Sequence, residues 1–178
     1  NRAFTLIEIL VVVSIMTMLS SFMIVYTRGS ENQIKILKDK AVFIGALYRA
    51  KSLALRTFSS LDAKVCGYGL YAKDENHFVV WRDLTTTPSC ADANMVYDGD
   101  HEDFEAPIAL SKSISFTNQD DPNFLKSILF IPPNPDVVTV PVILPSIKFK
   151  IGIGTTDGKS ATLIGVSRSG QVEPATGY

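Results

Sequence analysis

The sequence predicts an α+β fold in which one long N-terminal helix, about residues 4–58, packs on an antiparallel β-sheet. Residues 4–26 form an almost unbroken apolar run. Residues 30–58 contain no proline and repeat their apolar positions at a helical spacing. After residue 58 the apolar positions alternate, and Gly, Asn and Asp mark turns. A helix followed by antiparallel strands is the arrangement of α+β domains.

The apolar run carries one charged side chain, Glu8. As a helix the run is about 34 Å long, enough to cross a hydrocarbon core of about 30 Å. A carboxylate inside such a run costs roughly 2.5–3.5 kcal/mol to insert. Because the run contains no cation, we expect the partner of Glu8 on another molecule. A single-span anchor and a signal peptide remain alternatives, although the run exceeds the usual signal-peptide length of about 7–15 apolar residues.

The second half of the helix has two neighbouring apolar stripes. We expect one to pack on the sheet and the other to face neighbouring subunits, because together they are wider than a one-sided helix needs. One stripe comprises Ile34, Leu37, Ala41, Ile44, Tyr48 and Leu55, and the other Ile36, Phe43, Leu47, Ala50, Ala54 and Phe58. Four cations lie opposite, Lys35, Lys38, Arg49 and Arg56. They form either a solvated face or a surface that pairs with acidic loops of adjacent subunits.

The rest of the chain reads as strands with period-two alternation. The candidate strands are 64–72, 77–82, 114–117, 127–131, 137–144, 147–153, 160–167 and 171–173. Pro141 interrupts the fifth, which favours an edge position. Residues 155–158, Thr-Thr-Asp-Gly, are typical of a hairpin turn. Residues 84–112 have little strand pattern, and such long loops often carry function.

The segment FTLIE (residues 4–8) and the apolar run resemble the start of type IV pilins and type II secretion pseudopilins. The resemblance implies that a prepilin peptidase cleaves after Ala3 and methylates the new amino group of Phe4. Glu8, as the fifth mature residue, would then pair with the amine of a neighbouring subunit. Ala3 stands where the family usually has glycine, so residues 1–3 are either a leader remnant or an N-terminal extension. The implied division is a helix, 1–29, and a pilin-like domain, 30–178.

Two later segments resemble the GspH/FimT branch of minor pseudopilins and minor pilins. They are KVCGYGLYAKDENHFVVWRD (64–83) and ATLIGVSRSGQVEP (161–174). Some members of that branch bind DNA through basic residues near the C-terminus, where this chain offers Lys159 and Arg168. The net charge of −1 argues against a strongly nucleic-acid-binding surface. We therefore do not expect nucleic acid as a partner.

The resemblance also bears on the cysteines and the acidic loop. A pilin-like domain folds outside the cytoplasm, where disulfides persist, so Cys66 and Cys90 are expected to pair. The alternative is two buried thiols. Some pseudopilins bind calcium through loop carboxylates, which makes Asp98, Asp100 and Glu102 calcium candidates, although their spacing is not that of an EF-hand. A solvated charged loop is the alternative.

These features predict a structural subunit and not an enzyme. The chain has no nucleophile elbow, phosphate loop or dinucleotide fingerprint, and we expect no cofactor. The expected protein is a pilin that sits in the bacterial cytoplasmic membrane as a precursor and then joins a helical surface filament of identical subunits. Prepilin peptidase and the inner-membrane assembly machinery are its expected partners. A minor pilin at the filament tip, which binds DNA or a surface, and a secretion pseudopilin are the alternatives.

Overall fold

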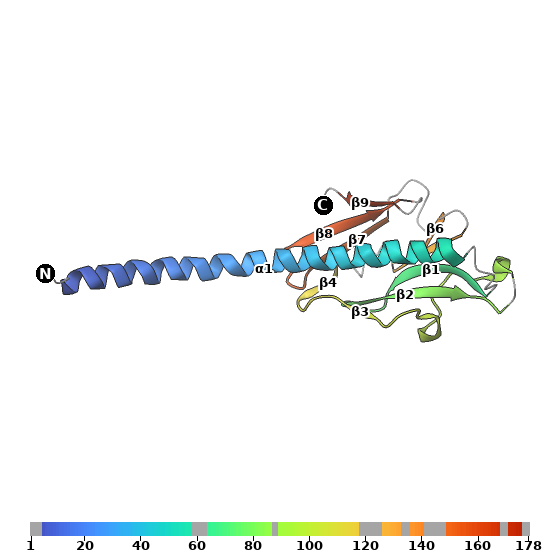
Figure 1. Ribbon diagram of the computed structural model, residues 1–178, viewed down its shortest axis with the longest axis horizontal. Helices are drawn as coiled ribbons and strands as arrows, with labels where there is room; N and C mark the ends of the chain where they lie inside the picture. The colour runs from blue at the N-terminus through green and yellow to red at the C-terminus, as the bar shows by residue number, and fades with distance from the viewer. Residues whose placement is uncertain are drawn as a thin grey trace.

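The computed structural model describes residues 5–57, 64–86, 89–117, 126–132, 136–140, 149–167 and 171–175. One helix, α1 (Leu6–Thr57), runs from the N-terminus into a domain built of strands. Its first half extends alone, and its second half lies against the strands (Figure 1). The predicted α+β class, with one long helix on antiparallel strands, is confirmed.

Helix α1 contains 52 residues, which corresponds to about 78 Å. It begins and ends within two residues of the predicted limits; Phe4 and Phe58 lie outside the described residues. The helix is continuous through Gly45, because a single glycine costs only about 1 kcal/mol in a helix of this length.

The strands form two antiparallel sheets, where the sequence predicted one. The first has the order β3-β2-β1-β5-β6 and the second β4-β7-β8-β9. Their bounds are β1 Val65–Ala72, β2 His77–Leu84, β3 Ile108–Ala109, β4 Ile114–Thr117, β5 Ser127–Ile131, β6 Asp136–Val140, β7 Phe149–Thr155, β8 Ala161–Val166 and β9 Val172–Ala175. The expected strand 137–144 corresponds to β6, and its residues 141–144 lie outside the described part of the chain. In the second sheet β7 pairs with β4 and with β8.

The core lies between α1 and the two sheets. Of the two helix stripes, the one that begins at Ile36 is buried and the one that begins at Ile34 is exposed along most of its length. Phe43 is at the centre, with edge-on contacts to Phe78 at 5.1 Å and Phe116 at 6.0 Å between ring centroids. The prediction that one stripe packs on the sheet is therefore confirmed, and the structure identifies which one.

A second, smaller packed layer covers the other face of the first sheet. Successive residues of a strand point to opposite faces, so Phe78 and Val80 point to α1 while Val79 and Trp81 point away from it. Val79 and Trp81 are nevertheless fully buried. Tyr97 packs edge-on against Trp81 and stacks on Tyr71. We call residues 89–107, which include Tyr97 and precede β3, the covering loop. This segment lies on the side of β2 away from α1 (Figure 1).

Candidate functional site

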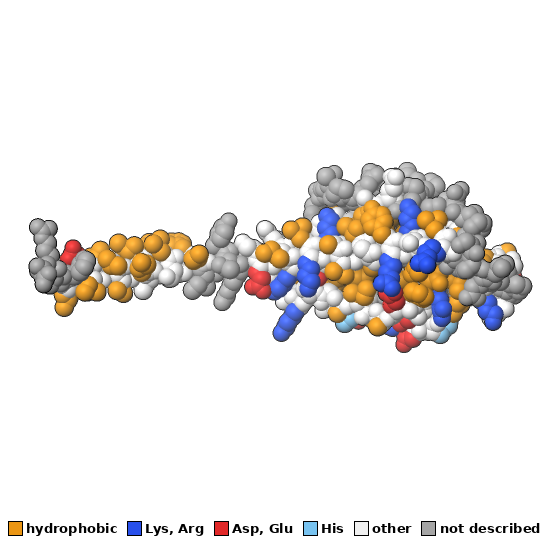
Figure 2. All heavy atoms as spheres, in the orientation of Figure 1, with side chains coloured by type: hydrophobic (Ala, Val, Ile, Leu, Met, Phe, Trp, Pro, Cys, Tyr) orange, Lys and Arg blue, Asp and Glu red, His pale blue; other side chains and the backbone are white. Residues whose placement is uncertain are grey.

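The first half of α1 has no packing partner in the described chain. The segment Leu6–Met23 has a mean hydropathy of 2.2, and none of it is buried. Its large apolar side chains are between 48% and 81% exposed. Figure 2 shows hydrophobic side chains along this extended part of the helix. By length and composition the segment suits a membrane or a bundle of similar helices, and water is an unfavourable environment for it.

Glu8 lies in the first turn of this helix and caps it. The backbone N–H and the hydroxyl of Thr5 both lie 3.2 Å from Glu8 Oε2, and the Glu8 N–H donates to Thr5 Oγ1 at 3.4 Å. This reciprocal pair is a capping box. The pattern Thr-x-x-Glu before an apolar run is the sequence signal of such a box, although the predictions above did not include it. Among the described residues, Glu8 forms no ion pair, and Phe4 lies outside them.

The hydroxyl groups of the apolar segment are satisfied within the helix. Ser14 donates to the carbonyl of Leu10 at 2.8 Å, and Ser20 to that of Met16 at 2.8 Å. Thr17 and Ser21 bond back in the same way, at 2.9 Å. Side chains bonded to their own helix need no water. Glu8 is therefore the one ionisable group that the described part of this segment presents to an apolar environment.

The cations on the second half of α1 are engaged partly by the chain itself. Lys35 pairs with Glu31 at 2.7 Å, and Arg49 forms an ion pair with Glu105 of the covering loop. Pairing with acidic loops of adjacent subunits was one predicted alternative for these cations; for Arg49 the acidic loop belongs to its own chain. Exposed ion pairs contribute little to stability, so the Arg49–Glu105 contact orients the covering loop more than it stabilises the domain.

Cys66 and Cys90 form the expected disulfide, with their Cα atoms 5.4 Å apart. Cys66 lies at an irregularity in the β1–β2 register, between Val65 and Gly67. Cys90 opens the short 3₁₀ helix Cys90–Asp92 at the start of the covering loop. The bond therefore fixes one end of the covering loop to β1.

We expect Cys66→Ser to destabilise the outer domain by roughly 3 kcal/mol, because the unfolded chain regains the entropy of a loop of about 25 residues. Thermal unfolding of the variant, with the reduced wild type alongside, measures the effect. Insertion of α1 into membranes should be unchanged, which membrane fractionation checks. An unchanged melting temperature would contradict this role.

The calcium candidates have other partners. Asp98 accepts from the Asn94 side chain at 2.6 Å, Asp100 pairs with Lys73 at 2.5 Å, and Glu102 is buried and accepts from the Asp98 N–H at 2.7 Å. The ion pair with Lys73 lowers the pKa of Asp100. In the part of the chain that the structure describes, no three metal-ligating side chains come together.

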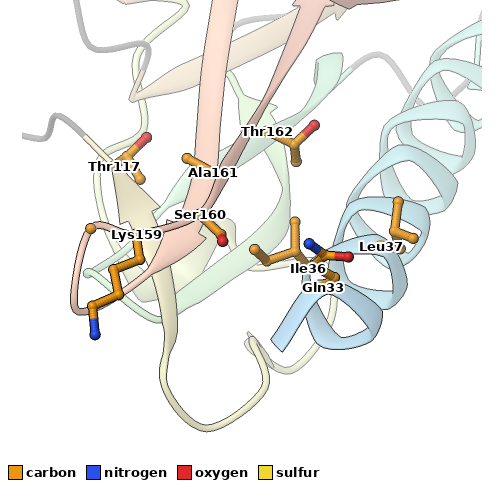
Figure 3. A pocket seen from close by; sticks show the side chains of 9 residues that line it. Gln33, Ile36, Leu37, Thr117, Lys159, Ser160, Ala161 and Thr162 are labelled. Carbon is orange, nitrogen blue, oxygen red and sulfur yellow. The ribbon is translucent and has the colours of Figure 1, made fainter. Parts of the chain in front are cut away.

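A groove of about 780 Å³ separates α1 from the turn between β7 and β8. Gln33, Ile36 and Leu37 line it from the helix, and Ala161 and Thr162 from β8 (Figure 3). The DNA candidate Lys159 lies at its rim and extends away from the helix; its ammonium is 3.5 Å from Asp157. Arg168 lies outside the described residues. A lone paired lysine is not the basic stripe that nucleic acid binding requires.

The N-terminus of this chain matches a known family model. Residues 1–24 match the model of the prokaryotic N-terminal methylation motif. Comparisons with curated proteins and with solved structures give no match. Proteins that carry this motif are structural, and the motif implies processing by prepilin peptidase and contact with the pilus assembly machinery. The N-terminus of this chain therefore carries the type IV prepilin-like signal, on an apolar helix that fits it.

Proposed function

We propose that this protein is a structural subunit of a type IV pilus, assembled through the first half of α1 into a helical filament. One observation carries the proposal. A bare apolar helix, which bears the methylation motif and a single carboxylate, projects from a folded domain as one continuous element with the domain's core helix. Pseudopilins carry the same motif, so the motif alone does not distinguish a pilus from a secretion pseudopilus. The assignment to a pilus is the more specific part of the proposal.

The exposed side chains explain why the helix needs an apolar partner. Leu6–Met23 presents 13 large apolar side chains to solvent. Burying each contributes about 1.5–3 kcal/mol, which sums to tens of kcal/mol. The precursor obtains this stabilisation in the membrane, and the filament supplies it again when helices of neighbouring subunits pack together. Hydrophobic burial alone therefore gives little preference for the filament over the membrane.

Glu8 supplies the preference for the filament over the membrane. In lipid its carboxylate has Thr5 as a partner but no cation, and roughly 2.5–3.5 kcal/mol of insertion cost remains. In a filament, the amino group that cleavage creates at Phe4 of a neighbouring subunit neutralises it. Pairing thus relieves a cost that exists only in the membrane, which draws the subunit into the filament.

The second half of α1 offers a further surface to neighbouring subunits. Ile34, Leu37 and Tyr48 are each more than half exposed, on the side of the helix opposite the core. They add an exposed apolar surface on the domain part of the same helix that carries Leu6–Met23. In Figure 2, hydrophobic side chains lie between the Lys and Arg side chains on this face of the domain.

Mass spectrometry of filaments sheared from native cells tests the proposal. We expect this protein to dominate the sheared fraction and its N-terminal peptide to begin with N-methylated Phe4. Such a peptide would place Glu8 at the fifth mature position. Dominance with an N-terminus at Asn1 would retain the filament but contradict the pairing of Glu8. Absence from the sheared fraction, with the protein retained in membranes, would overturn the pilin proposal in favour of a pseudopilin or a plain anchor. Scarcity in the sheared fraction would indicate a minor subunit.

A further inference from the structure

A carboxyl group without a partner lies beneath the covering loop. Asp83, near the end of β2, is fully buried, and neither of its carboxyl oxygens accepts or donates a hydrogen bond. It lies on the same face of β2 as Val79 and Trp81 and opposite Gly67 of β1. A buried ionised carboxylate without partners is costly, so the state of this group affects whatever covers it.

The groups that face Asp83 make its ionisation harder. Burial is the largest cause and the Glu102 carboxylate, itself buried, the second; together with Asp98 they raise the pKa of Asp83 to about 6. The backbone N–H of Met95, a residue with a φ of 59°, is the one influence that lowers the pKa of Asp83, and it does not offset the others. Among the described residues, every charged group that acts on Asp83 is therefore an acid, and the acids belong to the covering loop.

The loop is held to the sheet by contacts that do not involve Asp83. Tyr97 stacks on Tyr71 with ring centroids 4.1 Å apart and donates to Asp103 at 2.7 Å. Lys73 bridges Asp100 at 2.5 Å and Asp103 at 3.2 Å. The disulfide limits how far the Cys90 end can separate. None of these anchors involves the two buried carboxyl groups, Asp83 of β2 and Glu102 of the covering loop itself.

We propose that Asp83 makes the closure of the covering loop depend on protonation: the loop stays closed while this carboxyl carries its proton, and it loosens and uncovers Trp81 and Tyr97 when the carboxyl ionises. The two buried carboxyl groups differ in their hydrogen bonds. Glu102 accepts from two backbone N–H groups, Leu84 at 3.3 Å and Asp98 at 2.7 Å. Neither carboxyl oxygen of Asp83 has such a bond, so a charge on Asp83 is the one that the closed loop leaves without a donor.

The sign of the pH dependence follows from the direction of the shift. Between the ordinary pKa of 3.8 and about 6, the closed form binds more protons than an open form in which Asp83 meets water. Closure is therefore favoured at the acid end and weakens as the pH rises through this window. The difference of about two pH units corresponds to roughly a hundredfold change in the equilibrium between closed and open loop.

The chain has one tryptophan, Trp81, which lies under the loop and reports its closure directly. We would record its emission maximum and its quenching by acrylamide from about pH 4 to pH 8, on the full chain in detergent micelles without divalent cations. The expected result is a buried signal at low pH and a quenchable one at neutral pH, with a midpoint between the ordinary pKa of 3.8 and about 6. Asp83→Asn should remain buried throughout, because the amide carries no charge.

Two further variants separate this role from general stability. Glu31→Gln removes an exposed carboxylate of α1, whose partner is Lys35 and which lies outside the covering loop, and should leave the midpoint unchanged. Asp98→Asn removes one of the acids that face Asp83, keeps an acceptor for Asn94, and should move the midpoint to lower pH. A Trp81 signal that does not change with pH, or a midpoint that Asp83→Asn leaves in place, would overturn the proposal. Recovery of the closed signal at neutral pH by millimolar calcium, in the wild type but not in Asp83→Asn, would overturn it too, because the site would then hold a cation and not a proton.

Discussion

Cells that carry Glu8→Gln should make the protein, insert it into the membrane and fail to assemble it into filaments. The substitution retains the shape of the side chain and removes its charge. Glutamine at this position still completes a capping box with Thr5, so the start of α1 is preserved. What is lost is the attraction of a carboxylate for a neighbouring amine. Immunoblots of sheared and membrane fractions measure the outcome.

Two companion variants distinguish charge from capping. Glu8→Ala removes both, and Thr5→Val removes the hydroxyl that caps the helix while leaving the charge. If the charge drives assembly, Glu8→Gln and Glu8→Ala fail alike and Thr5→Val still assembles. If Glu8 serves only as a cap, Glu8→Gln assembles normally and Thr5→Val is impaired, and our account of assembly is wrong. Glu31→Gln, on the exposed part of α1, is the control for loss of a helical carboxylate.

Phe43→Ala should destabilise the domain by about 3–5 kcal/mol. Phe43 is 2% exposed and packs edge-on against Phe78 and Phe116, so its removal leaves a cavity between α1 and both sheets. A loss of this size is a large part of the stability of a domain, which is typically about 5–15 kcal/mol. Thermal or denaturant unfolding of the full chain in detergent measures it.

Tyr48→Ala is the matched control for the opposite stripe of the same helix. Tyr48 is 51% exposed, so we expect a change in stability within about 0.5 kcal/mol. Under the proposed function it should instead reduce the recovery of filaments, because its stripe faces neighbouring subunits. A Tyr48→Ala protein that unfolds as readily as Phe43→Ala would contradict the assignment of the two stripes.

Local rules account for the elements that the sequence predicted well. The long helix follows from an apolar run and from a helical repeat without proline, both of which can be read from the sequence. Strands β4 and β5 have the predicted bounds, because short alternating segments between turn residues leave little freedom. Strand ends are less well predicted: β2 extends to Leu84 and not to residue 82, because its pairing with β1 continues to Val65.

The arrangement of the strands was beyond local rules. Whether β4 joins β3 or β7 depends on which partner buries Ile114 and Phe116 against α1, and alternation is the same in either case. The position of the covering loop could not be predicted from local rules for the same reason. Its sequence is polar, yet Tyr97 and Glu102 pack onto the outer face of β2, which becomes a second buried layer. In the sequence Asp83 does not differ from an ordinary strand-end residue, because its burial depends on the covering loop.

The sequence by itself determined the first half of α1, because a membrane or bundle helix is specified by hydropathy, by length and by one carboxylate, all of which are local properties. It also determined which residues form the two stripes of α1 and which cysteines were available to pair. Only the tertiary structure decided which stripe is core and which is surface, how the strands divide between two sheets, and that Asp83 is buried among acids. Those outcomes depend on contacts between residues far apart in the chain, whose free energies no local pattern records.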